Sequence, residues 1–159
     1  MIVMVDITEI SAMVAATGVL VGVVFTVLQL RDLVKTRQTD LIMRVYSHYG
    51  SEEFQIAFDK FRQRKTKDIH DYEEKYGRAE FIVIGTFFEG IGILLRRHLI
   101  DIALVDDLFT SPTKLAWSEM KDSIIEVRKE YGMPTIFEWF EYLYNELKKR
   151  EQKLQQSKA

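Results

Sequence analysis

Histidine and aspartate are the residue types in this sequence that suit metal-assisted hydrolysis. His70 and Asp71 are adjacent, and His48 precedes them. With Asp101 or Asp106 downstream, they follow the order of ligands in a metal-dependent phosphohydrolase, where imidazoles and carboxylates hold the ion. A single His-Asp pair arises easily by chance, however, and both histidines fall near expected helix ends, where water would surround them. A membrane-tethered hydrolase is therefore the third of three functional hypotheses.

Motifs for other chemistries are absent from the sequence. It contains no G-x-S-x-G, no G-x-x-x-x-G-K-[ST] and no complete G-x-G-x-x-G. Neither E-x-x-H nor H-E-x-x-H occurs, which removes the usual di-iron and zinc-protease patterns. The chain has no cysteine, so thiolate catalysis, Cys-ligated metals and disulfides are excluded. We expect no cofactor, no resident metal and no enzymatic activity.

Glu89 is the best candidate for a buried ionisable group. It lies in the apolar segment Phe81–Leu95, where an ionised carboxyl group needs a partner. Arg96 follows two helical turns later on the same face, and Arg97 and Arg128 are alternative partners. One interpretation is a core ion pair or a hydrogen-bonded acid. The other is a carboxylate that senses a ligand or a proton.

Length and composition describe one domain with an appendage. The chain has 159 residues, of which 47% are hydrophobic and 29% are charged, so it can bury a core without lying wholly in lipid. Its net charge is −2, and no global basic field attracts nucleic acid. We therefore expect no nucleic-acid partner.

A run without charge extends from Ile10 to Leu30. Its 21 residues would form a helix of roughly 31 Å, the hydrocarbon thickness of a bilayer. The flanking charges are acidic before the run and basic after it: Asp6 and Glu9 against Arg31, Lys35, Arg37 and Arg44. Because basic residues stay on the cytoplasmic side, we predict an inner or plasma membrane protein with its N-terminus outside. The acidic start and the full-length run argue against a cleaved signal peptide.

This reading divides the chain into five segments. Residues 1–9 form a short extracytoplasmic N-terminus, residues 10–30 a transmembrane helix, and residues 31–49 its cytoplasmic continuation. Residues 50–147 form a helical cytoplasmic domain, and residues 148–159 a polar, frayed tail.

The transmembrane run has one face that differs from the rest. At 100° per residue, small or polar side chains fall within about 80° of one another, and bulky aliphatic side chains cover the other sides. This stripe consists of Ser11, Ala15, Gly18, Gly22, Thr26 and Gln29. The G-x-x-x-G spacing within it lets membrane helices approach closely, which favours association between copies. A water-filled pore lined by the stripe is the alternative, although no ionisable residue lies in it.

Apolar residues recur at helical spacing in the rest of the chain, and no alternation of period two indicates a strand. We predict an all-α domain in which Gly50 ends the first helix and Ser51 starts a short one. The remaining expected helices run from residues 68–71 to 99, over 102–109 from an Asp101 cap, from Ser111-Pro112 to Gly132, and onward from Pro134. Trp117 and the other aromatic residues at helical spacing are assigned to the core.

Glycines and a basic cluster add two expectations. Gly85, Gly90 and Gly92 lower helix propensity, which indicates close packing against a neighbour or a local bend. Residues 62–67 are rich in Lys and Arg; we favour a solvated helix end, with contact to anionic lipid headgroups as the alternative.

The order of several segments resembles a known family. These segments are F88-E-G-I-G-I-L-L-R-R-H-L-I-D101, L-V-D-D-L-F109, Trp117, I124-I-E-V-R128 and F137-E-W-F-E-Y-L143. Together they resemble an uncharacterised prokaryotic domain-of-unknown-function family with one N-terminal membrane helix and an all-α cytoplasmic domain. The resemblance covers nearly the whole chain and implies that architecture, without a catalytic residue, cofactor or substrate. Glu89, Arg96, Trp117 and Arg128 match its recurring positions.

The sequence therefore leads to one principal hypothesis. It describes a single-span protein in membrane lipid that forms homo-oligomers through its transmembrane helix and presents a helical bundle as a scaffold or sensor. A homo-oligomeric pore or ion channel is the alternative.

Overall fold

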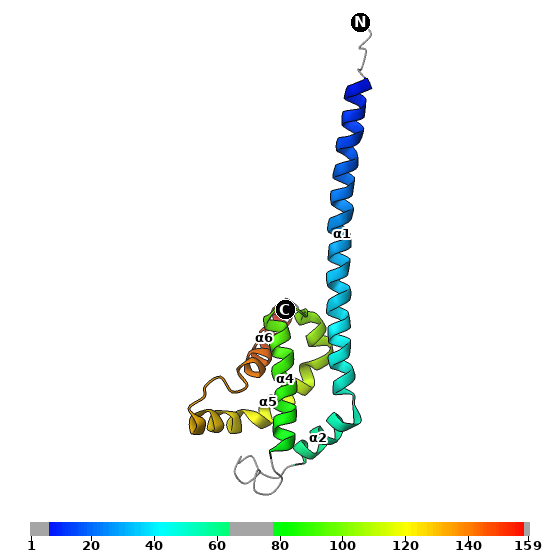
Figure 1. Cartoon of the computed structure of the whole chain (residues 1–159). Coiled ribbons are helices and arrows are strands. Elements are labelled where there is room, and N and C mark those ends of the chain that lie inside the picture. Colours follow the sequence, from blue (N-terminus) through cyan, green and yellow to red (C-terminus); the bar gives the residue numbers. More distant parts are fainter. Residues whose placement is uncertain (1–6, 64–77, 158–159) are drawn as a thin grey trace. The chain divides into compact units, whose positions relative to one another are not determined.

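The structure, a computed structural model, describes residues 7–63 and 78–157, and every regular element in these ranges is a helix (Figure 1). This confirms the all-α prediction. The described helices are α1 (Ile7–Tyr49), α2 (Glu52–Arg62), α4 (Ala79–Arg96), α5 (Ile102–Tyr131) and α6 (Glu138–Gln156). The chain divides into two compact units, one before and one after the boundary between Thr39 and Asp40.

In the described residues, the first unit consists of α1 up to Thr39. The helix runs unbroken to Tyr49, and Gly50 follows it, where the sequence placed its end. Of the described helices, α1 is the one that is long and apolar enough to cross a membrane. Its polar stretch after Leu30 stays helical, and Thr36 and Thr39 turn their hydroxyls to backbone carbonyls one turn earlier.

The second unit has a core built around α4. Phenylalanines from α2, α4, α5 and α6 are fully or almost fully buried and pack ring against ring, as Phe88 does on Phe140 with centroids 5.0 Å apart. Helix α4 packs against α2, α5 and α6. Ser51 caps α2 as predicted, because its hydroxyl accepts a hydrogen bond from the Phe54 N–H at 3.3 Å.

Helix α4 ends at Arg96, three residues earlier than expected. His98 takes a left-handed backbone conformation with a φ of 56°, and the N–H groups of His98 and Leu99 bond back to Leu95 and Leu94. These two bonds make a Schellman cap, which satisfies the last carbonyls of the helix and stops it. The expected start of this helix at residues 68–71 lies outside the described residues.

The prediction of two helices separated at Ser111-Pro112 is wrong. A single helix, α5, continues through Pro112, although proline leaves the Leu108 carbonyl without its usual intrahelical donor. Both halves present one continuous buried stripe, which runs through Val105, Phe109, Thr113, Ala116 and Met120. Burying this stripe stabilises the continuous helix more than one lost hydrogen bond costs.

Gly132 ends α5 in the left-handed conformation with a φ of 61°, as predicted. Pro134 does not open the last helix. Residues 134–137 form turns, and Phe137 has a φ of 53°, so α6 begins only at Glu138. A side chain from another helix stabilises this turn: Arg128 of α5 donates a hydrogen bond to the Ile136 carbonyl.

Residues 148–156 belong to α6, where we expected a frayed tail. Ion pairs hold this part of α6 to α5: Arg150 to Asp106 at 2.9 Å and Lys114 to Glu151 at 2.7 Å. The Thr110 hydroxyl and the Arg150 guanidinium keep the pKa of Asp106 below its ordinary value. The polar sequence pattern could not report these contacts, since their partners are far away along the chain.

Candidate functional site

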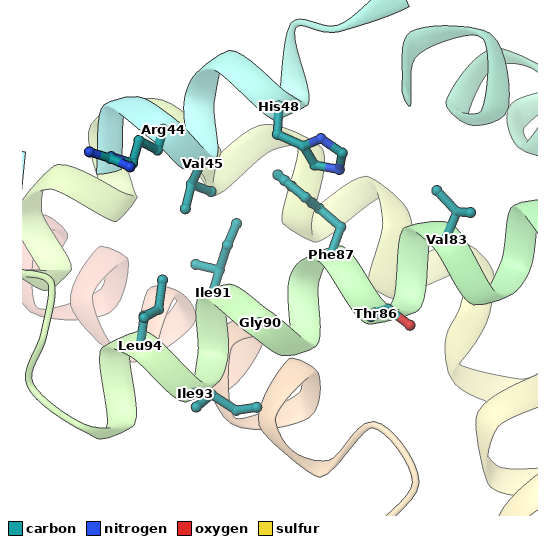
Figure 2. A pocket seen from close by; sticks show the side chains of 10 residues that line it. All are labelled: Arg44, Val45, His48, Val83, Thr86, Phe87, Gly90, Ile91, Ile93 and Leu94. Atoms are coloured by element: carbon teal, nitrogen blue, oxygen red, sulfur yellow. The ribbon is translucent and has the colours of Figure 1, made fainter. Parts of the chain in front are cut away.

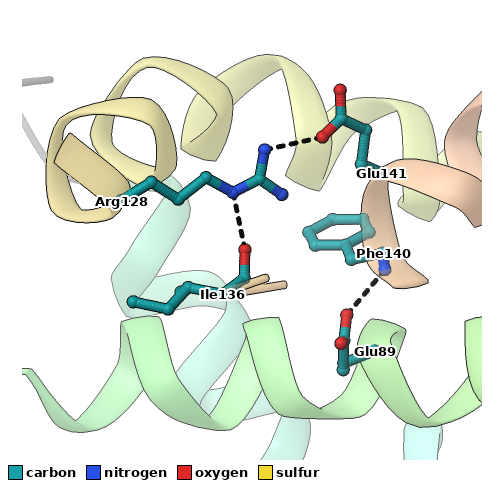
Figure 3. A network of polar contacts seen from close by, with 5 residues as sticks. All are labelled: Glu89, Arg128, Ile136, Phe140 and Glu141. Atoms are coloured by element: carbon teal, nitrogen blue, oxygen red, sulfur yellow. Dashed lines mark hydrogen bonds and ion pairs between the residues drawn. The ribbon is translucent and has the colours of Figure 1, made fainter. Parts of the chain in front are cut away.

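Glu89 caps the N-terminus of α6. Its Oε2 accepts a hydrogen bond from the Phe140 N–H at 2.7 Å (Figure 3). Phe140 is the third residue of α6, and the residue at the N-cap position, Phe137, makes no side-chain cap of its own. A carboxylate from another helix therefore satisfies a backbone donor that the first turn leaves open, and it lies at the positive end of the helix dipole.

Two glycines let α6 approach the backbone of α4. Gly85, Glu89 and Gly92 lie on one face of α4, four and three residues apart. A Cβ atom at Gly92 would lie 2.0 Å from the Trp139 carbonyl oxygen, and one at Gly85 would lie 2.5 Å from Cζ of Phe137. This confirms the prediction of close packing for these two glycines and explains how the N-terminal end of α6 reaches Glu89.

Arg128 holds the same segment from α5. Its Nε donates to the Ile136 carbonyl at 2.8 Å, and its Nη1 donates to Glu141 at 2.7 Å (Figure 3). Its Nη2 is buried and has no hydrogen-bond partner among the described residues. Figure 3 shows Arg128 and Glu89 on either side of Phe140. Helices α4 and α5 thus fix the start of α6 together.

Arg96 is not the buried partner that the sequence suggested. Its side chain is exposed, and its guanidinium carbon lies 6.0 Å from the centroid of the Trp139 ring. No ion pair joins Arg96 to Glu89 in the described ranges. The partner of Glu89 is a backbone N–H instead. The close approach of α6 to α4 places that donor next to the carboxylate.

Burial raises the pKa of Glu89 above its ordinary value. Hydrogen bonds from the Phe140 and Trp139 N–H groups oppose this shift, as does the positive charge of Arg128, while the nearby Glu138 carboxylate adds to it. The folded protein therefore binds a proton at Glu89 at pH values where the unfolded chain has released it.

Replacing Glu89 by Gln tests this linkage. Because the folded-state pKa is raised, the free energy of unfolding should fall as pH rises from the ordinary Glu pKa through the folded-state pKa, and the loss should be complete above it. Glu89→Gln keeps an oxygen to accept the Phe140 N–H but does not titrate, so this part of the pH dependence should vanish. Denaturant unfolding at a series of pH values measures it.

Glu89→Ala removes the cap altogether and should destabilise the fold by about 1 kcal/mol at neutral pH. Gln at this position should preserve that contribution. If Ala and Gln gave equal stability, Glu89 would not act as a cap.

Trp117 belongs to the core, as expected. It is buried, its ring meets Phe140 edge to face with centroids 5.1 Å apart, and it stacks on Tyr144 at 5.7 Å. Its position next to Phe140 makes its fluorescence a reporter of the α6 N-terminus.

The six stripe residues of α1 are exposed in the described chain. Nothing outside the helix lies within 4 Å of a Cβ built at Gly18 or Gly22, so the helix surface is open at both. The Thr26 hydroxyl donates to the Gly22 carbonyl at 2.8 Å, so its proton is used within the helix. Gln29 contributes a side-chain amide at the end of the stripe.

The histidines and aspartates of the hydrolase hypothesis do not converge in the described residues, which hold no group of three or more possible metal ligands. His48 packs against the rings of Phe54 and Phe87, with its centroid 5.8 Å from each. Asp101 caps α5 and Asp106 pairs with Arg150. His70 and Asp71 lie outside the described residues.

An apolar groove that the sequence did not predict lies beside α4 (Figure 2). It has a volume of about 570 Å³ and runs between the last turns of α1 and the outer face of α4. We call it the α4 groove; its lining residues are Arg44, Val45, His48, Val83, Thr86, Phe87, Gly90, Ile91, Ile93 and Leu94. The residue in the sequence that could have indicated this groove is Gly90. A Cβ at Gly90 would meet nothing within 4 Å, so close packing inside the described chain does not explain why this position is glycine.

Comparison with known proteins agrees with the resemblance. The family described as a domain of unknown function (DUF4760) matches residues 16–147, from within α1 to the last buried leucine of α6. No curated protein and no solved structure matches the sequence. Because the matched residues make up most of the chain, this protein belongs to the DUF4760 family.

Proposed function

We propose that this protein is a single-span membrane protein that self-associates through α1 and presents the α2–α6 bundle in the cytoplasm as a scaffold or sensor domain. The observation that carries the proposal is the open stripe on α1. Gly18 and Gly22 lie four residues apart on a helix that is long and apolar enough to cross a bilayer. In lipid, where no hydrophobic effect drives helices together, such close-approach surfaces supply the association energy.

Flanking charge supports the orientation. Acidic residues precede the apolar run and basic residues follow it, which is the charge pattern expected of a chain whose C-terminal bundle lies on the cytoplasmic side.

A pore is the less supported alternative. The described stripe offers a single side-chain amide, Gln29, and the Thr26 hydroxyl proton is already bonded within the helix. A pore also needs a closed ring of copies, so subunit number separates the two proposals.

The decisive experiment is native mass spectrometry of the full chain in detergent. We expect a homo-oligomer that Gly18→Leu with Gly22→Leu shifts to monomer, because two isobutyl side chains block the close approach of helix backbones. Ala16→Leu with Val23→Leu adds bulk on another side of α1 and is the matched control, which should leave the oligomer intact.

A wild-type chain that stays monomeric at high concentration would exclude self-association through α1. A dimer would exclude the pore, whereas a closed ring that conducts ions in planar bilayers, with a conductance changed by Gln29→Leu, would favour it.

A further inference from the structure

The outer face of α4 is an apolar part of the bundle that the described fold leaves uncovered. Between Phe81 and Leu95 the helix carries one charged residue, Glu89, and that side chain turns to α6. A helix this apolar on all sides is normally enclosed. Val83 and Ile93, however, keep 42% and 41% of their surface exposed. Exposed apolar surface of this kind marks an interaction site.

Gly90 indicates what kind of partner fits the outer face of α4. Glycine inside a helix costs about 1 kcal/mol relative to alanine. Contacts with Phe137 and with Trp139 of α6 account for Gly85 and Gly92, but a Cβ at Gly90 would meet nothing within 4 Å. Its missing side chain deepens the α4 groove at its middle, between Thr86 and Ile93 (Figure 2). The same device, a glycine between larger apolar residues, lets one helix approach the backbone of another.

We propose that the α4 groove is the docking site for α4 of a second copy of this chain, packed antiparallel across a two-fold axis. An axis near position 88 places Val83 of one copy opposite the other copy's Ile93, and Thr86 opposite the other copy's Gly90. Each larger residue thus meets a larger one, and the gap at glycine receives a threonine. The inference rests on the proposed function, because α1 is what brings two copies together.

Charge favours a second copy over the surface of a lipid bilayer. From Val83 to Ile93 the outer face of α4 presents no charged side chain, so two copies oppose no like charges. The cation that lines the groove, Arg44, forms an ion pair with Asp40 at 3.1 Å, so the pair adds no net positive charge that would attract an anionic headgroup. The surface is also a groove, which suits a rod-shaped helix better than a flat membrane.

The small size of the α4 contact explains why it forms only between copies that are already associated through α1. One pair of crossing helices buries less than the roughly 1,200 Å² of a stable interface. Two bundles tethered by associated spans, however, meet at an effective concentration in the millimolar range, where a weak interface is occupied. The α4 contact is therefore a second interface, formed once α1 has paired.

Site-specific crosslinking tests the proposal directly, because the natural chain contains no cysteine. The full chain with Thr86→Cys is reconstituted in phosphatidylcholine vesicles and treated with a short bis-maleimide. Thr86 is exposed, so the substitution should not disturb folding, and the fluorescence of Trp117 and Trp139 verifies this. Ser118→Cys, on an exposed face of α5, is the matched control. We expect covalent dimer to form at least tenfold faster with Thr86→Cys, and Gly90→Leu in that background to abolish it.

Native mass spectrometry of the same Thr86→Cys chain reports on the association of the spans. A homo-oligomer with no excess of crosslinked dimer from Thr86→Cys over the control would overturn the α4 contact and leave the proposed function standing. A chain that is monomeric and does not crosslink would overturn both. Thr86→Cys that does not crosslink, but is shielded from a water-soluble maleimide in vesicles and labelled in detergent, would identify the bilayer as the occupant and also overturn the proposal.

Discussion

Gly92→Ala should destabilise the bundle by on the order of 3 kcal/mol, the largest effect we expect from one added methyl group. The new Cβ would lie 2.0 Å from the Trp139 carbonyl oxygen. Both atoms are fixed by helix backbones, so no side-chain rotation relieves the overlap, and α6 must move away from α4. That movement would also take the Phe140 N–H away from Glu89. Denaturant unfolding of the full chain in detergent, followed by the fluorescence of its two tryptophans, measures the loss.

Gly90→Ala, two residues earlier on the same helix, is the matched control. Its Cβ meets nothing within 4 Å, so alanine should raise the free energy of unfolding of the monomer by about 0.5–1 kcal/mol through its higher helix propensity. Opposite signs at these two positions would establish the close approach of α6 to α4. Equal effects would contradict it.

Arg128→Ala should destabilise the fold by about 2 kcal/mol. Arg128 keeps 16% of its side chain exposed and donates to the Ile136 carbonyl, which loses a charge-assisted bond in the variant. Its ion pair with Glu141 contributes less, because that carboxylate is 43% exposed and solvent screens the pair. The variant should also raise the pKa of Glu89 further, since it removes a positive charge that lowers it.

Two variants give this prediction its controls. Lys129→Ala removes the neighbouring exposed cation and should change stability by less than about 0.5 kcal/mol. Arg128→Lys keeps the charge without the planar fork and should recover only part of the loss. A Lys variant as stable as the natural protein would show that position 128 supplies charge alone.

Local signals determined much of the architecture. Each of these signals acts within a short segment of the chain. The 21-residue uncharged run sets the length of the apolar helix, Ser51 caps α2 with its side chain, and Gly132 ends α5 in the left-handed backbone conformation. These are properties of the chain segment itself, so they were readable before any packing was known.

The predictions of helix starts at Pro112 and Pro134 were wrong, because tertiary contacts outweighed the local preference of proline. Pro112 is a strong local start signal, yet the buried stripe that crosses it keeps α5 in one piece. Pro134 is another, yet the bond from Arg128 to the Ile136 carbonyl holds the residues after it in turns. In both cases energy from distant partners exceeds the propensity of a single residue.

The candidate site divides in the same way. The sequence by itself determined that Glu89 is an acid in an apolar helix and that three glycines interrupt that helix, because residue type and spacing are local facts. Only the tertiary structure decided that the partner of Glu89 is the Phe140 N–H, 51 residues away, that Gly85 and Gly92 admit α6, and that Gly90 faces an open groove. Helical periodicity reports which residues share a face, but the element that covers each face is set by packing between segments far apart in the chain.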